Sequence, residues 1–354
     1  MSVVRPFAAR VVRPDRAPHQ VTALTDSSPG DEPSRAATDP ASYDHAGPAV
    51  YAYRQAGDGL DCVGLVCEVA VEAFVDGRVR GHEAVQPARV EALVRRHAVA
   101  PAPPALVALI HHAGPAFLRT VETTCTSAPA LDFPGPGGLR QTVWRLPAGA
   151  ATHAVTEELS AAAHYIADGH HRVAAAIEEW RLAGKPPDTG VLCVVHPMGG
   201  LRVSAFHRRV AGPVNPSDVL DLLAPSFAVR AVAEAPPPGL GTLGLYVGQR
   251  WFEVTYQGPR GDGMLAFDAA ILRGRVLDRL ERRGSGPSYD VEIAPARTPV
   301  AELVRRCDGD GGALFTLAPP ALDAITELAD AGEVMPPKTT YFEPKPCAGI
   351  FLRP

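Results

Sequence analysis

The chain has 354 residues and a formal net charge of −5, enough sequence for two domains or for one elaborated domain. Its lysines and arginines form no long run, so we do not expect nucleic acid to be a main ligand. No apolar stretch is long enough for a signal peptide or a transmembrane helix, so the sequence predicts a cytoplasmic protein with no membrane partner.

The six cysteines stand singly, without the paired CxxC spacing that is typical of structural zinc sites. Cys62, Cys67 and Cys193 lie in apolar runs that are typical of strands. The pattern therefore favours buried, reduced thiols over disulfides or zinc. His82, Glu83, His170, His171 and His207 could converge on a divalent ion, but no spacing such as HExxH is present, so we expect no metal site built by the protein itself.

The first half of the chain predicts strands and helices in mixed order. Residues 25–48 are rich in Ser, Pro, Asp and Gly and predict an exposed, flexible loop. Strands are expected at residues 3–12, 50–54, 62–74, 105–110, 141–146, 191–196 and 201–210, and helices at 87–97, 115–123, 156–163 and 170–183. Glu157 and Glu158 are expected in a first helical turn. Two hairpins are predicted, one turning at residues 57–59 and the other at 199–200.

The second half continues in the same mixed order. Helices are expected at residues 215–223, 267–280, 300–307 and 319–331, and strands at 243–257, near 291 and at 313–317. Because there is no strict βαβ repetition, we predict an α+β fold with mixed or antiparallel sheets. We place an N-terminal α+β domain at 1–210 and a C-terminal α+β domain at 211–354.

One short motif, Asp168-Gly169-His170-His171-Arg172, lies between an apolar run and a helical pattern. Gly169 permits a tight turn, and the helix start that follows offers unpaired backbone N–H groups and the positive end of its dipole. With two imidazoles and a guanidinium nearby, this corner suits a phosphate. The alternative is that Asp168 caps a core helix while the histidines pack or are solvated.

A proline-rich segment near the C-terminus, residues 335–345, is called the strap below. It contains Lys338 and Lys345 and two threonines, which can present hydrogen-bond donors to an anion. The alternative is a stiff connection that packs Tyr341 and Phe342 on the core.

Several motifs together resemble the bacterial and archaeal domain-of-unknown-function 1015 (DUF1015) family. They are Arg5-Pro6-Phe7, Tyr51-Ala52-Tyr53-Arg54-Gln55, Gly81-His82-Glu83, Tyr165-Ile166-Ala167-Asp168-Gly169-His170-His171-Arg172, His207-Arg208 and the strap. The chain departs from this family in two places. A Pro-Pro-Tyr-Asp element after the first strand is missing, and Val85 stands where the family has threonine.

The Asp-Gly-His-His-Arg corner also resembles the phosphate-binding turn of the ParB/sulfiredoxin-like superfamily. Members of that superfamily bind nucleotides, and some phosphorylate free L-serine with ADP or ATP as the donor. The resemblance implies a ParB/sulfiredoxin-like core elaborated by a second α+β half, with ATP or ADP and Mg²⁺ as cofactors.

These resemblances imply a nucleotide-dependent phosphotransferase that acts on a small hydroxylated metabolite, with free L-serine as the specific candidate. The predicted phosphate- and nucleotide-binding residues are Gly169, His170, Arg172, His207, Lys338 and Lys345. The predicted catalytic residues are Glu83, Asp168 and His171. Glu83 is the expected general base, and Asp168 could replace it or hold Mg²⁺.

Arg172 is expected to be exposed, so its replacement by alanine should remove nucleotide binding and leave the fold intact. The expected partners are a nucleotide and a small substrate. The sequence leaves open whether the chain forms a homodimer. The alternative function is a nucleotide-binding regulatory or accessory protein without turnover.

Overall fold

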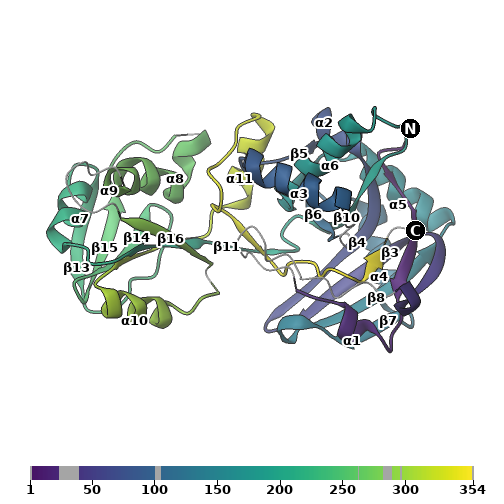
Figure 1. The fold of residues 1–354 in the computed structure, drawn as a ribbon, viewed down its shortest axis with the longest axis horizontal. Helices are drawn as coiled ribbons and strands as arrows, with labels where there is room; N and C mark the ends of the chain where they lie inside the picture. The colour runs from purple at the N-terminus through teal and green to yellow at the C-terminus, as the bar shows by residue number, and fades with distance from the viewer. Residues whose placement is uncertain are drawn as a thin grey trace. The chain divides into compact units, whose positions relative to one another are not determined.

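A computed structural model describes residues 2–23, 40–99, 105–261, 263–281, 289–295 and 297–352 of the chain, which form two compact units (Figure 1). The first unit consists of Met1–Gly81, Val85–Arg202 and Pro344–Pro354, and the second of His82–Ala84 and Val203–Glu343. The strap therefore contributes to both units. The predicted domains at 1–210 and 211–354 stay a prediction, because compactness alone does not define a functional domain.

The first unit is built on one 11-stranded sheet with the order β19-β2-β3-β4-β10-β6-β9-β5, in which β1 pairs with β4 and β8 pairs with β3 and β7. Among its described strands, the pairs β10–β6 and β5–β9 are parallel and the other pairs are antiparallel. The bounds are β1 (Val4–Arg5), β2 (Phe7–Val12), β3 (Tyr43–Gly57), β4 (Leu60–Ala70), β5 (Val79–Arg80), β6 (Val107–His111), β7 (Leu131–Pro134), β8 (Arg140–Pro147), β9 (His164–Asp168), β10 (Gly190–Pro197) and β19 (Phe351–Leu352).

Helices cover this sheet, whose central strands are mostly apolar. Every residue of β6 is buried, as expected for a strand with both faces covered. The helices are α1 (Ala17–Gln20), α2 (Val71–Val75), α3 (Pro87–Val99), α4 (Pro115–Cys125), α5 (Ala150–Ala161) and α6 (His170–Leu182), with 3₁₀ turns η1 (Pro40–Ser42) and η2 (Pro136–Gly138). In Figure 1, α3 lies beside α6 and α4 beside α5. Phe117, Leu159 and Val173 bring α4, α5 and α6 into the core of this unit.

The second unit contains a six-stranded antiparallel sheet with the order β13-β15-β14-β17-β12-β16. Its strands are β12 (Phe206–Ala211), β13 (Phe227–Val232), β14 (Thr242–Val247), β15 (Arg250–Tyr256), β16 (Asp290–Pro295) and β17 (Ala313–Thr316), and β11 (Arg202–Ser204) pairs with β18 (Tyr341–Glu343). Its helices are α7 (Pro216–Leu223), α8 (Asp268–Leu272), α9 (Asp278–Glu281), α10 (Val300–Asp310) and α11 (Leu322–Asp330), with a 3₁₀ turn η3 (Gly263–Ala266) and a π-helical turn η4 (Arg273–Leu277).

Alternation along β17 explains how this second sheet is covered on both faces. Ala313 and Phe315 join one hydrophobic cluster with α7 and the α8–α9 segment, whereas Leu314 joins another with Leu303 and Cys307 of α10. Figure 1 shows α7 and α8 on one side of the sheet and α10 on the other. The predicted α+β class with mixed or antiparallel sheets is confirmed.

The second predicted hairpin is wrong. Strand β10 lies between β4 and β6, and β12 pairs with β16 and β17 in the second unit. Strand β10 is buried along almost its whole length, so it occupies the centre of the first sheet and not a hairpin at its edge. The hairpin predicted at residues 57–59 is confirmed by the pairing of β3 with β4.

Two predicted boundaries also shift. Strand β4 ends at Ala70 and α2 follows it, so residues 71–74 are helical. Helix α5 begins at Ala150, so neither Glu157 nor Glu158 is in its first turn. The Glu158 carboxylate instead accepts hydrogen bonds of 2.7 and 2.9 Å from the N–H groups of Ala116 and Phe117 at the start of α4. Such a carboxylate satisfies donors that a helix start leaves open.

The loop predicted at residues 25–48 is in part a strand. Residues 43–48 belong to β3, where pairing with β2 satisfies the backbone although many side chains are polar and exposed. Residues 25–39 lie outside the described part of the chain. The six cysteines are free thiols, and burial raises the pKa of Cys67 to about 12. No helix in the described ranges combines the length and the apolar character needed to cross a lipid bilayer.

Candidate functional site

The predicted strand, tight turn and helix at residues 165–183 is present in the first unit. Strand β9 ends at Asp168, and α6 begins at His170. Between them Gly169 has φ of 108°, a left-handed conformation that strains any residue with a Cβ atom. A Cβ atom at this position would also lie 3.1 Å from the guanidinium of Arg172. The left-handed φ therefore favours glycine at this position, and the tight contact with Arg172 adds to that preference.

The carboxylate of Asp168 forms ion pairs with Arg172 and with Lys345 of the strap. The Nζ atom of Lys345 donates to Oδ1 of Asp168 at 2.6 Å, and Nη2 of Arg172 donates to Oδ2. These three side chains expose only 18, 17 and 13% of their area for Asp168, Arg172 and Lys345. Burial alone would raise the pKa of Asp168, but the charges of Lys345 and Arg172 outweigh it and hold that pKa well below its ordinary value.

The guanidinium of Arg172 has a second fixed contact. Its Nη1 atom donates to the carbonyl of Leu106, just before β6, at a distance of 2.7 Å. Because β6 pairs with β9, this bond and the Asp168 ion pair tie the start of α6 to two neighbouring strands. The expectation of an exposed Arg172 is therefore wrong, and its replacement by alanine should reduce stability as well as any anion binding.

The two histidines of the motif have different environments. His170 is buried against Gly81, and burial lowers the pKa of His170 to about 4, so its ring is neutral at pH 7. The Nε2 atom of His171 accepts a hydrogen bond of 3.0 Å from the backbone N–H of Gln86. Its Nε2 is then unprotonated, and its proton is on Nδ1. At neutral pH the positive charge of this corner thus comes from Arg172 and Lys345.

Three other predicted residues, Glu83, His207 and Lys338, belong to the second unit. The carboxylate of Glu83 accepts a hydrogen bond of 3.2 Å from the backbone N–H of Lys338. The carbonyl of Lys338 accepts one of 2.9 Å from Nη2 of the buried Arg208, so this part of the strap is held from two sides. The Lys338 ammonium lies 5.3 Å from the centre of the Phe206 ring.

His207 lies on β12. Its Nδ1 atom accepts a hydrogen bond of 3.3 Å from the N–H of Leu317, and burial lowers the pKa of His207 to about 4. It is therefore a neutral ring that ties β12 to the segment after β17. Neither this hydrogen bond nor the lowered pKa indicates an anion site at His207.

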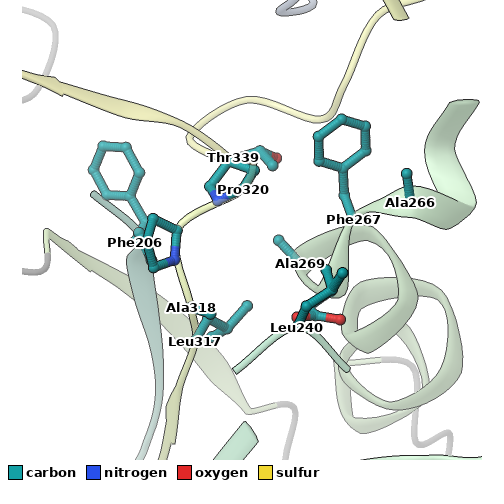
Figure 2. Close-up of a pocket in the computed structure, with 12 residues that line it drawn as sticks. Phe206, Leu240, Ala266, Phe267, Ala269, Leu317, Ala318, Pro320 and Thr339 are labelled. Carbon is teal, nitrogen blue, oxygen red and sulfur yellow. The ribbon is translucent and has the colours of Figure 1, made fainter. Parts of the chain in front are cut away.

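A small pocket lies beside β12 in the same unit (Figure 2). Phe206, Leu317 and Pro320 line one side of it, and Leu240 and Ala269 line the other. Its polar lining groups are bonded within the protein. The carboxylate of Asp268 accepts from the N–H of Gly241 and pairs with Arg260, and the Thr339 hydroxyl donates to the carbonyl of Pro336.

Sequence reasoning missed the residues that hold Lys345 in place. Nε2 of Gln55 donates to the Lys345 carbonyl at 3.0 Å, and the hydroxyl of Tyr53 accepts from the N–H of Cys347 at 3.3 Å. A signal was present: Tyr53 and Gln55 belong to one motif and are two residues apart, so they share a face of a strand. The bonds to the strap cannot be read from the sequence because they span almost the whole chain.

The choice of cation at position 345 is also informative. Lysine is rare in this chain: three of its 34 Lys and Arg residues are lysines, namely Lys185, Lys338 and Lys345. Two of these three lie in the strap. An ammonium is a more compact and more strongly hydrated charge than a guanidinium, so lysine and arginine are not equivalent at this position.

Comparison with known protein families decides the affiliation of the chain. The family model described as protein of unknown function (DUF1015) matches residues 43–281, more than half of the sequence. The chain belongs to the DUF1015 family. Within this DUF1015 protein the match includes Glu83, the Asp168–Arg172 motif and His207, whereas the strap lies beyond its end. The resemblance of the motif to the ParB/sulfiredoxin-like turn stays a prediction.

No curated protein matches the DUF1015 chain. Solved structures that it resembles include free serine kinase in complex with AMP, with 15% identity and a TM-score of 0.43 over 80% of this chain and 91% of that one. Another is SbnI with C-terminal truncation from Staphylococcus aureus, with 14% identity and a TM-score of 0.45 over 81% and 87%. A third is a conserved hypothetical protein from Pyrococcus furiosus, with 16% identity and a TM-score of 0.41 over 78% and 90%.

Proposed function

We propose that this DUF1015 protein is a nucleotide-dependent phosphotransferase that acts on a small hydroxylated metabolite. The observation that carries the proposal is the pairing of one carboxylate, Asp168, with two cations, Arg172 and Lys345, at the N-terminus of α6. This cluster keeps one net positive charge, and the helix dipole adds to it. A partly buried positive corner at a helix start suits the phosphates of a nucleotide.

In this proposal each residue of the corner has a limited task. Arg172 offers a planar guanidinium that can bridge two phosphate oxygens, and Lys345 supplies a compact charge. His170, neutral at pH 7, and His171, with its proton on Nδ1, can act as uncharged donors. Phosphoryl transfer needs little more from a protein than such positioning and charge stabilisation.

Asp168 is poorly suited to be the general base that the sequence offered as an alternative. Its depressed pKa makes its carboxylate a weak acceptor for the proton of an alcohol at neutral pH. In our proposal Asp168 is a positioning residue that orients Arg172 and Lys345. Glu83 stays the predicted base, with its carboxylate oriented by the N–H of Lys338.

The proposed donor is ATP or ADP, which brings Mg²⁺ on its phosphates. Within the described ranges no three His, Cys, Asp or Glu side chains gather as a metal site would require, and both oxygens of Asp168 already accept from cations. In phosphotransfer sites Mg²⁺ binds through few protein carboxylates and several phosphate oxygens and waters. When bound, the ion would screen the phosphate charge.

The test is a phosphate-transfer assay with ATP and ADP as donors, with free L-serine first and then other amino acids and small alcohols. Product is detected by mass spectrometry, and ADP binding is measured by calorimetry. Arg172→Ala and Arg172→Lys should form no product and should bind ADP at least tenfold more weakly, which corresponds to about 1.4 kcal/mol of binding free energy. Arg54→Ala, which removes an exposed arginine paired with Asp61, is the matched control and should retain both.

A regulatory or accessory protein that binds nucleotide without turnover is the second candidate. It is favoured by the missing Pro-Pro-Tyr-Asp element and by Val85 at a family threonine position. ADP binding that depends on Arg172, with no phosphate transferred to any acceptor, would support this second function. A wild-type protein that neither binds ADP nor transfers phosphate would reject both proposals.

A further inference from the structure

We infer that Tyr53 and Gln55 are positioning residues that set the ammonium of Lys345 beside Asp168. The functional meaning of this role rests on the proposed nucleotide site. The physical claim, that these two side chains fix Lys345, rests on contacts within the first unit alone. The inference assigns a role to the Tyr51–Gln55 motif, which has none in the proposed phosphate transfer.

Gln55 binds the backbone of Lys345 directly. Its side-chain amide donates to the Lys345 carbonyl at 3.0 Å, and the Gln55 residue is only 1% exposed. A buried amide donor that loses its acceptor carries a desolvation cost, so the bond strongly favours this place for the strap.

Tyr53 holds the strap two residues further on. Its hydroxyl accepts from the N–H of Cys347 at 3.3 Å and donates to Oε1 of Gln141 at 2.6 Å. The amide of Gln141 is fixed in turn, since its Nε2 atom donates to the carbonyl of Leu139 at 3.0 Å. Burial raises the pKa of Tyr53 well above its ordinary value, so the hydroxyl keeps its proton at neutral pH.

The local sequence makes these two bonds important. Lys345 lies between Pro344 and Pro346, and proline has no N–H with which to bind a neighbouring strand. The hydrogen bonds to the carbonyl of Lys345 and from the N–H of Cys347 therefore attach this part of the strap to β3. Because the backbone of Lys345 is fixed, placing its Nζ atom 2.6 Å from Oδ1 of Asp168 costs less conformational entropy.

The small number of lysines allows a direct test. Acetic anhydride reacts with an amine only when the amine is unprotonated and accessible, so the labelling rate reports how often that state occurs. Peptide mass spectrometry can follow Lys185, Lys338 and Lys345 separately. In Tyr53→Phe and Gln55→Met, which keep the volume but lose the polar atom, we expect Lys345 to be labelled about fivefold faster, the factor that matches one lost net hydrogen bond. The exposed Lys185 should keep its rate in both variants.

Two matched controls remove equivalent groups elsewhere. Tyr246→Phe removes a hydroxyl that donates to Asp308 at 2.6 Å, and Gln257→Met removes an exposed amide that donates to the carbonyl of Thr255. Both should leave the Lys345 rate at the wild-type value. Should either test variant be partly unfolded, Gln141→Met gives an independent reading, because the bond that links Gln141 to the strap among the described residues runs through the Tyr53 hydroxyl. Unchanged labelling of Lys345 in the folded variants would overturn the inference.

A second arm separates this inference from the proposed function. In the wild-type protein, ADP should protect Lys345 from the reagent and leave Lys185 unprotected. In Tyr53→Phe the protection should require about fivefold more ADP. Faster labelling without any ADP protection would support the positioning role and reject the nucleotide site at Lys345. ADP protection that is equal in the wild-type and variant proteins, with unchanged labelling of Lys345 in the absence of ADP, would instead overturn the positioning role.

Discussion

The ammonium of Lys345 donates a hydrogen bond of 2.6 Å to the carboxylate of Asp168, which precedes it in the chain by 177 residues. Asp168 ends strand β9, whereas Lys345 belongs to a segment that returns near the C-terminus. The bond therefore joins the turn before α6 to the strap. The charge of the corner depends on both, because Arg172 alone would only neutralise Asp168.

Replacing Asp168 by asparagine should destabilise the protein by about 2–3 kcal/mol. The change leaves Arg172 and Lys345, both mostly buried, without the carboxylate that separates their charges. Urea unfolding followed by circular dichroism measures the loss as a lower midpoint with an unchanged slope.

The matched control for this change is Asp61→Asn. Asp61 pairs with Arg54 through bonds of 2.6 Å, yet both side chains are well exposed, so the unfolding midpoint should hardly move. Equal midpoints for the Asp168 and Asp61 variants would show that the corner is not a buried charge cluster.

The two glycines that flank α6 allow backbone strain to be separated from a steric clash. Gly169 and Gly184 both have positive φ, 108° and 80°. A Cβ atom at 184 would meet nothing within 4 Å, whereas one at 169 would contact Arg172. Gly184→Ala should cost about 1 kcal/mol and Gly169→Ala about 2–3 kcal/mol. Only Gly169→Ala should also weaken ADP binding, since it displaces the guanidinium; equal effects on both would contradict the predicted contact.

Local patterns predicted the parts of this corner that depend on neighbouring residues. The apolar run, Gly169 and the helical spacing after it predict strand, turn and helix without reference to the rest of the chain, and the structure contains them. The helix predicted at 87–97 from its apolar spacing is present as α3, and the helix predicted at 215–223 is present as α7.

Long-range pairing could not be predicted in the same way. Strand β10 looks like half of a hairpin because a glycine pair follows it, yet its apolar side chains are better buried between β4 and β6. Arg172 looks exposed at a helix start, but Asp168 and the Leu106 carbonyl enclose it. Such partners are chosen by the tertiary fold, and no spacing in the sequence encodes them.

Stability should fall in mild acid because neutral histidines are buried in the first unit. His111 is fully buried, and burial, with the nearby His164 and other histidines, lowers the pKa of His111 to about 3. Below pH 6.5 the unfolded chain binds a proton that the folded chain does not, so each pH unit costs about 1.4 kcal/mol for this group. The stabilising contribution is therefore complete above pH 6.5 and is lost as the pH falls toward the folded value.

Replacing His111 by leucine tests this account. Neither ring nitrogen of His111 has a hydrogen-bond partner among the described residues, so the change should cost little at pH 8 and should reduce the loss of stability between pH 6.5 and 4. Thermal unfolding across that range measures the difference. His153→Leu, at a well-exposed position, is the control and should keep the wild-type slope. An identical slope in the His111 variant would assign the acid sensitivity to other groups.

Replacing Lys345 by methionine should weaken ADP binding about tenfold, equivalent to about 1.4 kcal/mol, because it leaves Arg172 and Asp168 as a neutral pair with no net charge for a phosphate. Lys345→Arg should restore only part of the affinity, since the larger guanidinium has to fit a place in which the lysine side chain is 13% exposed. Calorimetric titration with ADP measures both variants beside Lys185→Met, which removes an exposed ammonium stacked on Trp180 and should bind as the wild-type protein does. Wild-type affinity in Lys345→Met would mean that the strap contributes no charge to the site, and the phosphate corner would then have to be reassigned to α6 alone.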